Sequence, residues 1–188
     1  MTRIRLDRFD VSRTFGRGCP VWFEASWYAC KAFFFLSPWP WPSAFKRWLL
    51  RIFGARVGKG VVIKPRVNIH MPWRLEVGDH SWIGEEAYLL SLDRIVVGSH
   101  CCISQRAFLC TGNHDFRDEA FSFRGGPIKV GDGAWVGASA FVGPGVEIGD
   151  EAVVSAGSVV LKSLPAGMVC SGNPAEPRSK RWRDGPAG

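Results

Sequence analysis

Residues 130–160 read VGDGAWVGASAFVGPGVEIGDEAVVSAGSVV, and an aliphatic residue recurs in this stretch at every sixth position. An amphipathic helix would repeat its apolar residues every 3.6 positions, and a half-buried strand would repeat them every two. A period of six is typical of a parallel β-solenoid, in which each short strand ends in a sharp turn and three strands complete one coil.

The same register extends upstream through most of the chain. Two insertions of two residues, near Leu75–Glu76 and Ile95–Val96, shift the register and predict small bulges. The fifteen recurring positions predict about five stacked coils. They are Val57, Ile63, Ile69, Val77, Ile83, Leu89, Val97, Ile103, Leu109, Val130, Val136, Val142, Ile148, Val154 and Val160.

Small residues accompany the aliphatic ones at regular places. A glycine often follows directly, as at Gly78 and Gly137, and a small or branched residue stands four positions further on, as at Ala134 and Ala152. Small side chains fit the inside of a corner, and glycine relieves a tight backbone. The sequence therefore predicts an all-β solenoid.

A basic and aromatic extension, residues 1–56, precedes the repeat. We expect two short helices in it, at about 21–36 and 43–53, because SPWPWP separates them. The second would place Phe45, Trp48, Leu49 and Ile52 on one apolar face. Charged residues and prolines interrupt the segment 21–55, so it does not read as a membrane span. The helices either pack on the solenoid or lie in a membrane interface.

Composition excludes several functional classes. The 188-residue chain has a formal net charge of +7, with basic ends and an acidic middle, but no nucleic-acid-binding motif, so we expect no nucleic acid as partner. Its six cysteines lack C-x-x-C spacing and predict reduced thiols. The arginine-rich start lacks the apolar core of a secretory signal. We expect a cytoplasmic protein, held at the inner face of the membrane if the extension touches lipid.

Four stretches are more specific than the repeat itself. They are LEVGDHSWIGEEAYLL (75–90), VVGSHCCISQRAFLCTGNHDFRDEAF (96–121), PIKVGDGAWVGASAFVGPGVEIGDEAVVSAGSVVLKSLP (127–165) and SGNPAEP (171–177). With LLRIFGARVGKGV (49–61), they resemble the hexapeptide-repeat acyltransferases, most of all the colanic-acid-biosynthesis type of sugar O-acetyltransferase. The resemblance covers about residues 45–182. It implies a left-handed parallel β-helix, a homotrimer, acetyl-CoA as donor and active sites between neighbouring subunits.

The chain then divides into three parts. Residues 1–56 form the helical extension, and residues 57–164 form the β-helix catalytic domain with one long protruding loop at 115–127. Residues 165–188 form a closing turn, which includes Gly172–Ala175, and a basic tail. A long loop on a rigid scaffold is often functional, and we expect this one to act as a lid or as an arm that reaches a neighbour.

His114 stands where that loop begins, in CTGNHDF. A sugar hydroxyl is a poor nucleophile at neutral pH, so acetyl transfer needs a general base, and histidine is the usual choice. The resemblance places the catalytic histidine of the family at His114. Its other ring nitrogen needs an acceptor, for which we expect a backbone carbonyl or a carboxylate such as Asp93. Asn113 or backbone N–H groups are the candidate oxyanion donors.

The resemblance also implies two binding surfaces. The acceptor surface would hold the loop residues Asp115, Phe116 and Arg117, with Ser91 or Asp93 in the place of an asparagine found in maltose-type relatives. The donor groove would run along the coils after the loop, where small residues let the amide-bearing arm of CoA lie against the backbone. Lysine and arginine there would bind its phosphates. The donor residues are Ala138, Ala156, Gly157, Lys162, Arg178 and Arg181.

The function predicted is O-acetylation of a sugar or glycan during exopolysaccharide biosynthesis, with no metal. Two alternatives remain open. The acceptor is an antibiotic or an amino sugar, with N- or O-acetylation. The protein is a non-enzymatic trimeric solenoid that binds partners. Less favoured are a zinc site, because no paired histidine spacing lies near His114, and Cys110 as an acyl-accepting nucleophile, because four residues of β-coil span about 13 Å.

Overall fold

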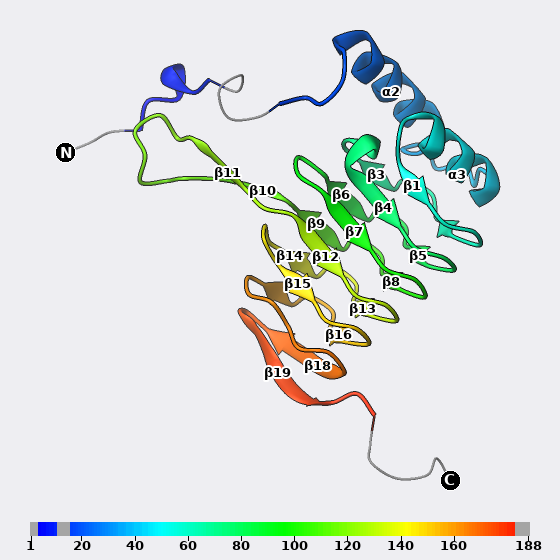
Figure 1. Cartoon of the computed structure of the whole chain (residues 1–188), viewed down its shortest axis with the longest axis vertical. Coiled ribbons are helices and arrows are strands. Elements are labelled where there is room, and N and C mark those ends of the chain that lie inside the picture. Colours follow the sequence, from blue (N-terminus) through cyan, green and yellow to red (C-terminus); the bar gives the residue numbers. More distant parts are fainter. Residues whose placement is uncertain (1–3, 11–15, 183–188) are drawn as a thin grey trace.

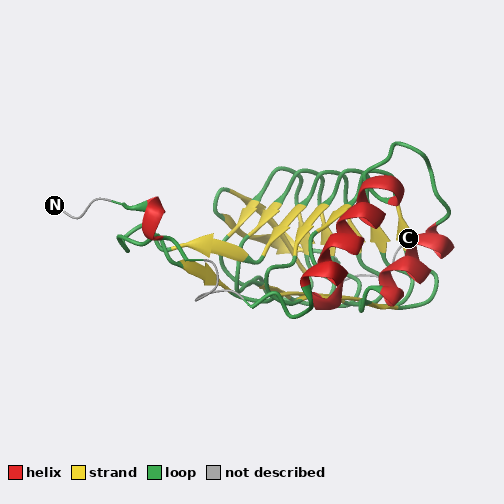
Figure 2. Cartoon of the chain, turned by 90° about the horizontal axis from the view of Figure 1, so that it is seen from above, coloured by secondary structure: helices red, strands yellow, loops and turns green. Residues whose placement is uncertain are grey.

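The computed structural model describes residues 4–10 and 16–182 and has the predicted architecture, a left-handed parallel β-helix. Short parallel strands follow one another around a triangular core in five complete coils and the beginning of a sixth (Figure 1). Two helices, α2 (Val21–Phe34) and α3 (Ser43–Ile52), lie over the first coil (Figures 1 and 2). Their bounds agree with the prediction to within two residues.

Three parallel sheets form the faces of the solenoid. The first sheet holds β1 (Arg56–Val57), β4 (Leu75–Val77), β7 (Ile95–Val97), β12 (Ile128–Val130) and β15 (Glu147–Ile148). The second holds β2 (Val62–Ile63), β5 (Trp82–Ile83), β8 (Cys102–Ile103), β13 (Trp135–Val136), β16 (Val153–Val154), β18 (Met168–Gly172) and β19 (Ala175–Lys180). The third holds β3 (Asn68–Ile69), β6 (Tyr88–Leu90), β9 (Phe108–Cys110), β14 (Phe141–Val142) and β17 (Val159–Val160).

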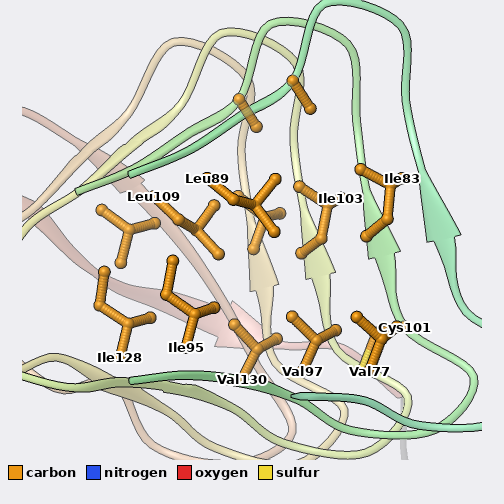
Figure 3. Packing of buried hydrophobic residues seen from close by; sticks show 14 of the residues in the cluster. Val77, Ile83, Leu89, Ile95, Val97, Cys101, Ile103, Leu109, Ile128 and Val130 are labelled. Atoms are coloured by element: carbon orange, nitrogen blue, oxygen red, sulfur yellow. The ribbon is translucent and has the colours of Figure 1, made fainter. Parts of the chain in front are cut away.

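The core consists of columns of aliphatic side chains that run along each face from coil to coil. Val77, Val97 and Val130 follow one another in paired strands of the first sheet, and Figure 3 shows this column beside those of the other faces. Each of the fifteen aliphatic positions predicted from the sequence is buried, at 8% exposure or less. The hexapeptide register is therefore confirmed along its whole length.

We call the turns between the first and second sheets the first corner, and those between the second and third sheets the second corner. The third corner joins the third sheet to the first sheet of the next coil. The extra residues near 72–74 and 91–94 lie in the third corner, where Pro72–Arg74 forms a short 3-10 helix, η2. Strands β4 and β7 pair in continuous register, so the bulges expected at Leu75–Glu76 and Ile95–Val96 are absent. A corner can lengthen without disturbing the ladder, whereas a bulge within a strand would shift it.

Close approach of successive coils explains the glycines. A Cβ on Gly78 would lie 2.5 Å from the backbone nitrogen of Ser99, and one on Gly137 would lie 2.6 Å from that of Ala156. These glycines are needed for space, not for an unusual backbone angle, because neither has a positive φ. The left-handed conformations fall later in each turn, at residues such as His80 and Arg106.

The helices cap the open edge of the first coil, which is the first of the two alternatives considered for them. A sheet edge leaves backbone carbonyls without strand partners. Arg51 donates to the carbonyl of Val57 at 2.6 and 2.9 Å, and Arg47 to that of Val61 at 2.7 Å. On the third sheet, the indole of Trp27 donates to the carbonyls of Ile69 and His70. Within the described parts of the chain, no helix has the length and apolar character that crossing a bilayer requires.

The buried face of α3 differs from the predicted one. Leu49 and Leu50 are buried together with Lys46, whereas Trp48 and Ile52 are about half exposed. The reason is the edge beneath the helix, because Lys46 Nζ donates to the carbonyl of Lys64 at 2.9 Å. A simple apolar-face pattern cannot anticipate a basic side chain that is buried to satisfy backbone oxygens.

The opposite end of the solenoid is closed by a hairpin. β18 continues the second sheet beyond residue 164, and β19 folds back on it in antiparallel pairing through the turn at Gly172–Ala175. The outer strand β19 is rich in exposed charged residues and contains Pro177. Such a strand resists further pairing, so the stack ends here.

Lys46 leads to a prediction on stability. Burial lowers its pKa to about 8. The unfolded chain keeps a value near 10.4, so unfolding takes up a proton between these values. The free energy of unfolding should therefore rise with pH from 8 to 10, by at most about 1 kcal/mol per pH unit from this group. Lys46→Met should flatten the rise in urea unfolding measured at pH 8, 9 and 10.

The exposed Lys59 provides the matched control, because Lys59→Met removes a lysine without touching the cap. Its slope should equal that of the parent chain. Equal slopes in the parent and in Lys46→Met would contradict the assignment.

Candidate active site

The one long excursion from the coils is a β-hairpin that leaves the third corner. β10 (Gly112–His114) pairs antiparallel with β11 (Phe123–Gly125), and we call residues 112–125 the arm. The loop expected at 115–127 is therefore shorter, with strand pairing on both sides of residues 115–122. The arm projects away from the body of the solenoid (Figure 2). Asp118 holds its tip, because its carboxylate accepts hydrogen bonds from the backbone N–H groups of Ala120 and Ser122.

His114 ends β10 and is partly buried. Its Nδ1 lies 2.8 Å from the backbone carbonyl oxygen of Phe121. A carbonyl can only accept, so Nδ1 carries the hydrogen, and Nε2 is the basic nitrogen of the neutral ring. The orienting group is thus a backbone carbonyl, the first of the two kinds of acceptor considered from the sequence.

Phe121 also holds the imidazole through its side chain. The two rings stack with centroids 4.4 Å apart and an interplanar angle of 9°. Phe121 has φ of +51°, a left-handed conformation that is uncommon for a bulky residue and carries strain. That conformation accompanies a residue whose carbonyl and ring both contact His114. The sequence did not indicate the contact of Phe121 with His114, because nothing in residues 121–123 (FSF) signals a positive φ.

A hollow of about 290 Å³ opens beside His114. Its lining comes from the arm and from the next coil, and includes Asn113, Phe116, Arg124 and Pro144. Phe116 is 71% exposed, which leaves an apolar ring available to a ligand. A hollow with an imidazole, an amide, a guanidinium and a phenyl ring suits a polar ligand with one apolar face, such as a sugar.

The other predicted acceptor residues differ in their position and in how far they are buried. Asp115 lies on the arm, where its carboxylate accepts the backbone N–H of Arg117 at 2.9 Å. Asp93 lies at the third corner one coil before the arm, and its N–H donates to Thr111 Oγ1. Ser91 is fully buried, and its hydroxyl is engaged with the backbone N–H and C=O of Met71. Ser91 therefore presents no group to a ligand.

Asn113 is exposed, and its side-chain oxygen accepts the backbone N–H of His114 at 2.8 Å. The side chain of Asn113 lines the hollow. A side-chain amide is a neutral donor of the kind that stabilises a developing oxyanion, and this role of Asn113 stays a prediction.

Most of the predicted donor residues lie at other corners of the solenoid than the hollow beside His114. Ala138, Ala156 and Gly157 fall in the second corner, in two successive coils, because Gly157 N–H donates to the carbonyl of Ala138. A Cβ on Gly157 would meet nothing within 4 Å, so the backbone there is open to a ligand. Such a track of small exposed residues fits an extended chain that carries amides.

The three basic residues of the donor group lie at three different corners. Arg178 lies below the same corner, where its guanidinium donates to the carbonyl of Ser171. Lys162 follows β17 and is exposed in the third corner. Arg181 belongs to the first corner, because it donates to the carbonyls of Gly133 and Glu151. Arg181 thus lies apart from the other predicted donor residues.

His114 and the donor track therefore occupy different corners of one chain. His114 and Lys162 belong to the third corner, while Ala138, Ala156 and Arg178 belong to the second. The third sheet separates these two corners within a chain.

The rival readings of the sequence find less support. His80 and His100 stack at the first corner, with ring centroids 5.4 Å apart, as their shared repeat position indicated. Across residues 4–10 and 16–182, no cluster of three or more histidine, cysteine or acidic side chains forms a metal-binding group. Cys110 is buried, its thiol donates to the carbonyl of Gly112, and burial raises its pKa, which makes it a poor nucleophile.

Comparisons with known proteins agree on one family. A sequence profile for the hexapeptide repeat of succinyl-transferase matches residues 127–162. The chain is 44% identical over 173 residues to the colanic acid biosynthesis acetyltransferase WcaF of Escherichia coli K12, an alignment that covers 90% of this chain and 93% of WcaF.

Solved structures have the same fold. The hexapeptide-repeat acetyltransferase VCA0836 of Vibrio cholerae, complexed with acetyl coenzyme A, superimposes with a TM-score of 0.71 at 26% identity, over 76% of this chain and 80% of that chain. A galactoside acetyltransferase in complex with coenzyme A gives a TM-score of 0.79 over 95% of this chain and 92% of that chain. At 21% identity, this second likeness concerns the fold alone.

The hydrogen bond to Phe121 predicts the tautomer of His114. In a chain labelled with ¹⁵N at histidine, the neutral imidazole of His114 should show a protonated Nδ1 and an unprotonated Nε2. Phe121→Gly should keep this tautomer, because glycine retains the carbonyl and favours a positive φ. His114→Gln identifies the signals by their loss. A neutral ring protonated at Nε2 would contradict the assigned hydrogen bond.

Proposed function

Because this chain belongs to the hexapeptide-repeat acetyltransferase family, we propose that it transfers the acetyl group of acetyl-CoA to a hydroxyl of a sugar in exopolysaccharide assembly. The likeness to WcaF supports the pathway class, since the two chains match over nearly their whole lengths. One geometric observation supports the assignment of the catalytic base. His114 beside a ligand-sized hollow has Nδ1 engaged by a backbone carbonyl, which leaves Nε2 as a base.

The proposed reaction uses His114 as general base. Its Nε2 takes the proton of the sugar hydroxyl as the hydroxyl oxygen bonds to the thioester carbonyl carbon. The carbon–sulfur bond then breaks, and the imidazolium returns the proton to the leaving thiolate. The carbonyl of Phe121 keeps the ring oriented and stabilises the cation that forms. Asn113 is the candidate donor to the oxyanion.

Acetyl-CoA would lie along the second corner of one chain and reach His114 of a neighbour. The backbone at Ala138, Ala156 and Gly157 suits the amides of its long arm. Arg178 at the same corner, and Lys162 at the third corner of the neighbour that supplies His114, suit its phosphates. The two corners lie apart in one chain, which supports an active site shared between subunits of a homotrimer. Acetyl-CoA supplies the acyl group and the thiolate leaving group when bound.

The outer faces beside the second corner are suited to a neighbouring chain. Trp82 and Trp135 of the second sheet are about half exposed. On the third sheet, the rings of Tyr88 and Phe108 stack at 4.8 Å, and Phe141 follows. The first sheet carries ion pairs on its outer face instead, such as Lys129 with Glu147. Aromatic faces on both sides of the donor track favour its burial between subunits.

His114→Gln should lower the rate of acetyl transfer by roughly 100- to 10,000-fold, because the base is lost. Binding of acetyl-CoA, measured by calorimetry, should stay within about twofold. The double variant Lys162→Ala and Arg178→Ala should instead weaken the binding of acetyl-CoA, because the phosphate contacts are lost while His114 stays in place. A thiol-detection assay of CoA release with a panel of sugars, amino sugars and phenicol antibiotics gives the rates and separates hydroxyl from amine acceptors.

Near-normal transfer by His114→Gln would remove the base assignment. Turnover confined to amine acceptors would replace the sugar-hydroxyl proposal with N-acetylation. A chain that binds no acetyl-CoA would favour the solenoid as a binding protein.

We also propose that the helical extension touches the membrane surface through its exposed aromatic residues. Trp22 and Phe33 are each 71% exposed, and Trp39 is 65% exposed. The basic residues of α3 are engaged with the solenoid, because Lys46, Arg47 and Arg51 donate to carbonyls of the first coil. Contact would thus be driven by apolar burial, with little contribution from anionic lipid.

Cosedimentation with phosphatidylcholine vesicles should detect this binding, and replacing one quarter of the lipid by phosphatidylserine should change it less than threefold. Replacing Trp22, Phe33 and Trp39 together by alanine should weaken it about tenfold or more. Trp182→Ala, at the opposite end of the solenoid and 61% exposed, is the control. Binding unaffected by the triple change, or dependent on phosphatidylserine, would reject the proposal.

A further inference from the structure

A segment far from the arm in sequence lies against it. Residues Ile4–Asp10, which include the short 3-10 helix η1 (Leu6–Arg8), run beside the tip of the arm (Figures 1 and 2). The backbone N–H of Arg5 donates to the carbonyl of Glu119 at 2.8 Å. The guanidinium of Arg8 forms an ion pair with the carboxylate of Glu119 at 2.7 Å. We call residues 4–10 the strap.

The residues just before α2 are held at the third corner. The indole of Trp73, in η2, donates to the carbonyl of Arg17 at 2.9 Å. Arg74 donates to the carbonyl of Gly16 and to that of Leu92 in the next coil. The chain before α2 is therefore tied to the corner from which the arm emerges two coils later.

Phe9 of the strap lies against the imidazole of His114. The ring centroids are 5.1 Å apart at an interplanar angle of 67°. Two further rings near His114, Phe121 and Phe123, come from the arm itself. Phe9 is partly buried although its strap neighbour Leu6 is 65% exposed. Phe9 is thus partly buried because it contacts the arm, since the strap as a whole is not buried.

We propose that the strap is a movable wall of the active site and that Phe9 is a positioning residue that shields His114 from water. The proposal rests on the function proposed above, because shielding matters only if His114 is a base. Water competes with any sugar hydroxyl for the acetyl group, and the arm projects from the solenoid. A base on such an arm needs cover that the coils of its own chain do not supply.

The attachment of the strap suits a wall that opens. Arg8 and Glu119 are both solvent-exposed, with 56% and 37% of their side-chain surface accessible. Exposed ion pairs contribute little to stability, so the pair between Arg8 and Glu119 does not by itself fix the strap against the arm. An acceptor can displace such a wall and let it close again behind the substrate.

Accessibility of His114 tests the wall without any acceptor or any turnover. Diethylpyrocarbonate acylates unprotonated, exposed imidazole nitrogens, and mass spectrometry of peptides reports each histidine separately. His80 and His100 are exposed at the first corner and serve as internal references. In the full-length chain, His114 should react several-fold more slowly than either reference.

Phe9→Ala should speed acylation of His114 about fivefold or more and leave the references unchanged. Leu6→Ala, which alters an exposed residue of the same strap, should leave all three rates unchanged. Arg8→Glu places a second negative charge beside Glu119 and should speed acylation, but less than Phe9→Ala does, and the charge exchange Arg8→Glu with Glu119→Arg should restore the slow rate. An unchanged rate in Phe9→Ala, or a fast rate in the unaltered chain, would overturn the wall.

A second readout separates this inference from the proposed function. Acetyl-CoA in buffer without acceptor is the probe, and its hydrolysis to acetate and CoA is followed by the free thiol. Phe9→Ala should raise this hydrolysis at least fivefold, and Phe9→Leu should restore most of the low rate. If acylation of His114 responds to the strap but no variant releases CoA, either alone or with the panel of acceptors, the wall stands and the acetyltransferase proposal fails. If transfer is normal and acylation ignores Phe9, the wall alone fails.

Discussion

The stacking of each coil on the next by parallel backbone hydrogen bonds is the constraint on which this structure depends. It forces residues at equal places in successive coils into columns, and it allows no side chain where two coils meet closely. Aliphatic columns fill the interior, and glycines such as Gly78 and Gly137 stand where a Cβ would strike the next coil. Stacking also leaves two edges. The helices satisfy one with buried donors such as Lys46, and the hairpin of β18 and β19 closes the other.

The same columns decide where chemistry can occur. Within one chain a corner is a straight track, suited to hold an extended ligand along several coils. It is poorly suited to surround a small reacting group, because residues of different corners face away from each other. The arm resolves part of this problem by carrying His114 out of the third corner, and Phe121 fixes its ring. On our proposals, the remainder of the site comes from outside the coil, from a neighbouring chain and from the strap.

Sequence alone predicted the fold and the catalytic candidate because both depend on local, repeated signals. Each inward aliphatic residue is marked by its period, and His114 is marked by the interruption of that period. Ser91 and Phe121 were beyond this reasoning. Ser91 falls in the lengthened third corner, where the period no longer tells which side chain points inward, and it is buried against Met71. The role of Phe121 depends on a positive φ, and that of Phe9 on a contact more than 100 residues distant in sequence.

The central claim is that one active site is built from two chains, and mixed oligomers test it most directly. His114→Gln removes the base from the third corner, and Ala156→Trp blocks the donor track at the second corner. Each variant alone should be inactive in acetyl transfer. Chains of the two kinds, unfolded and refolded together, should recover a substantial fraction of activity, because some interfaces pair an intact His114 with an intact track. No recovery in oligomers shown by mass to contain both chains would mean that each site lies within a single chain, and would contradict the account.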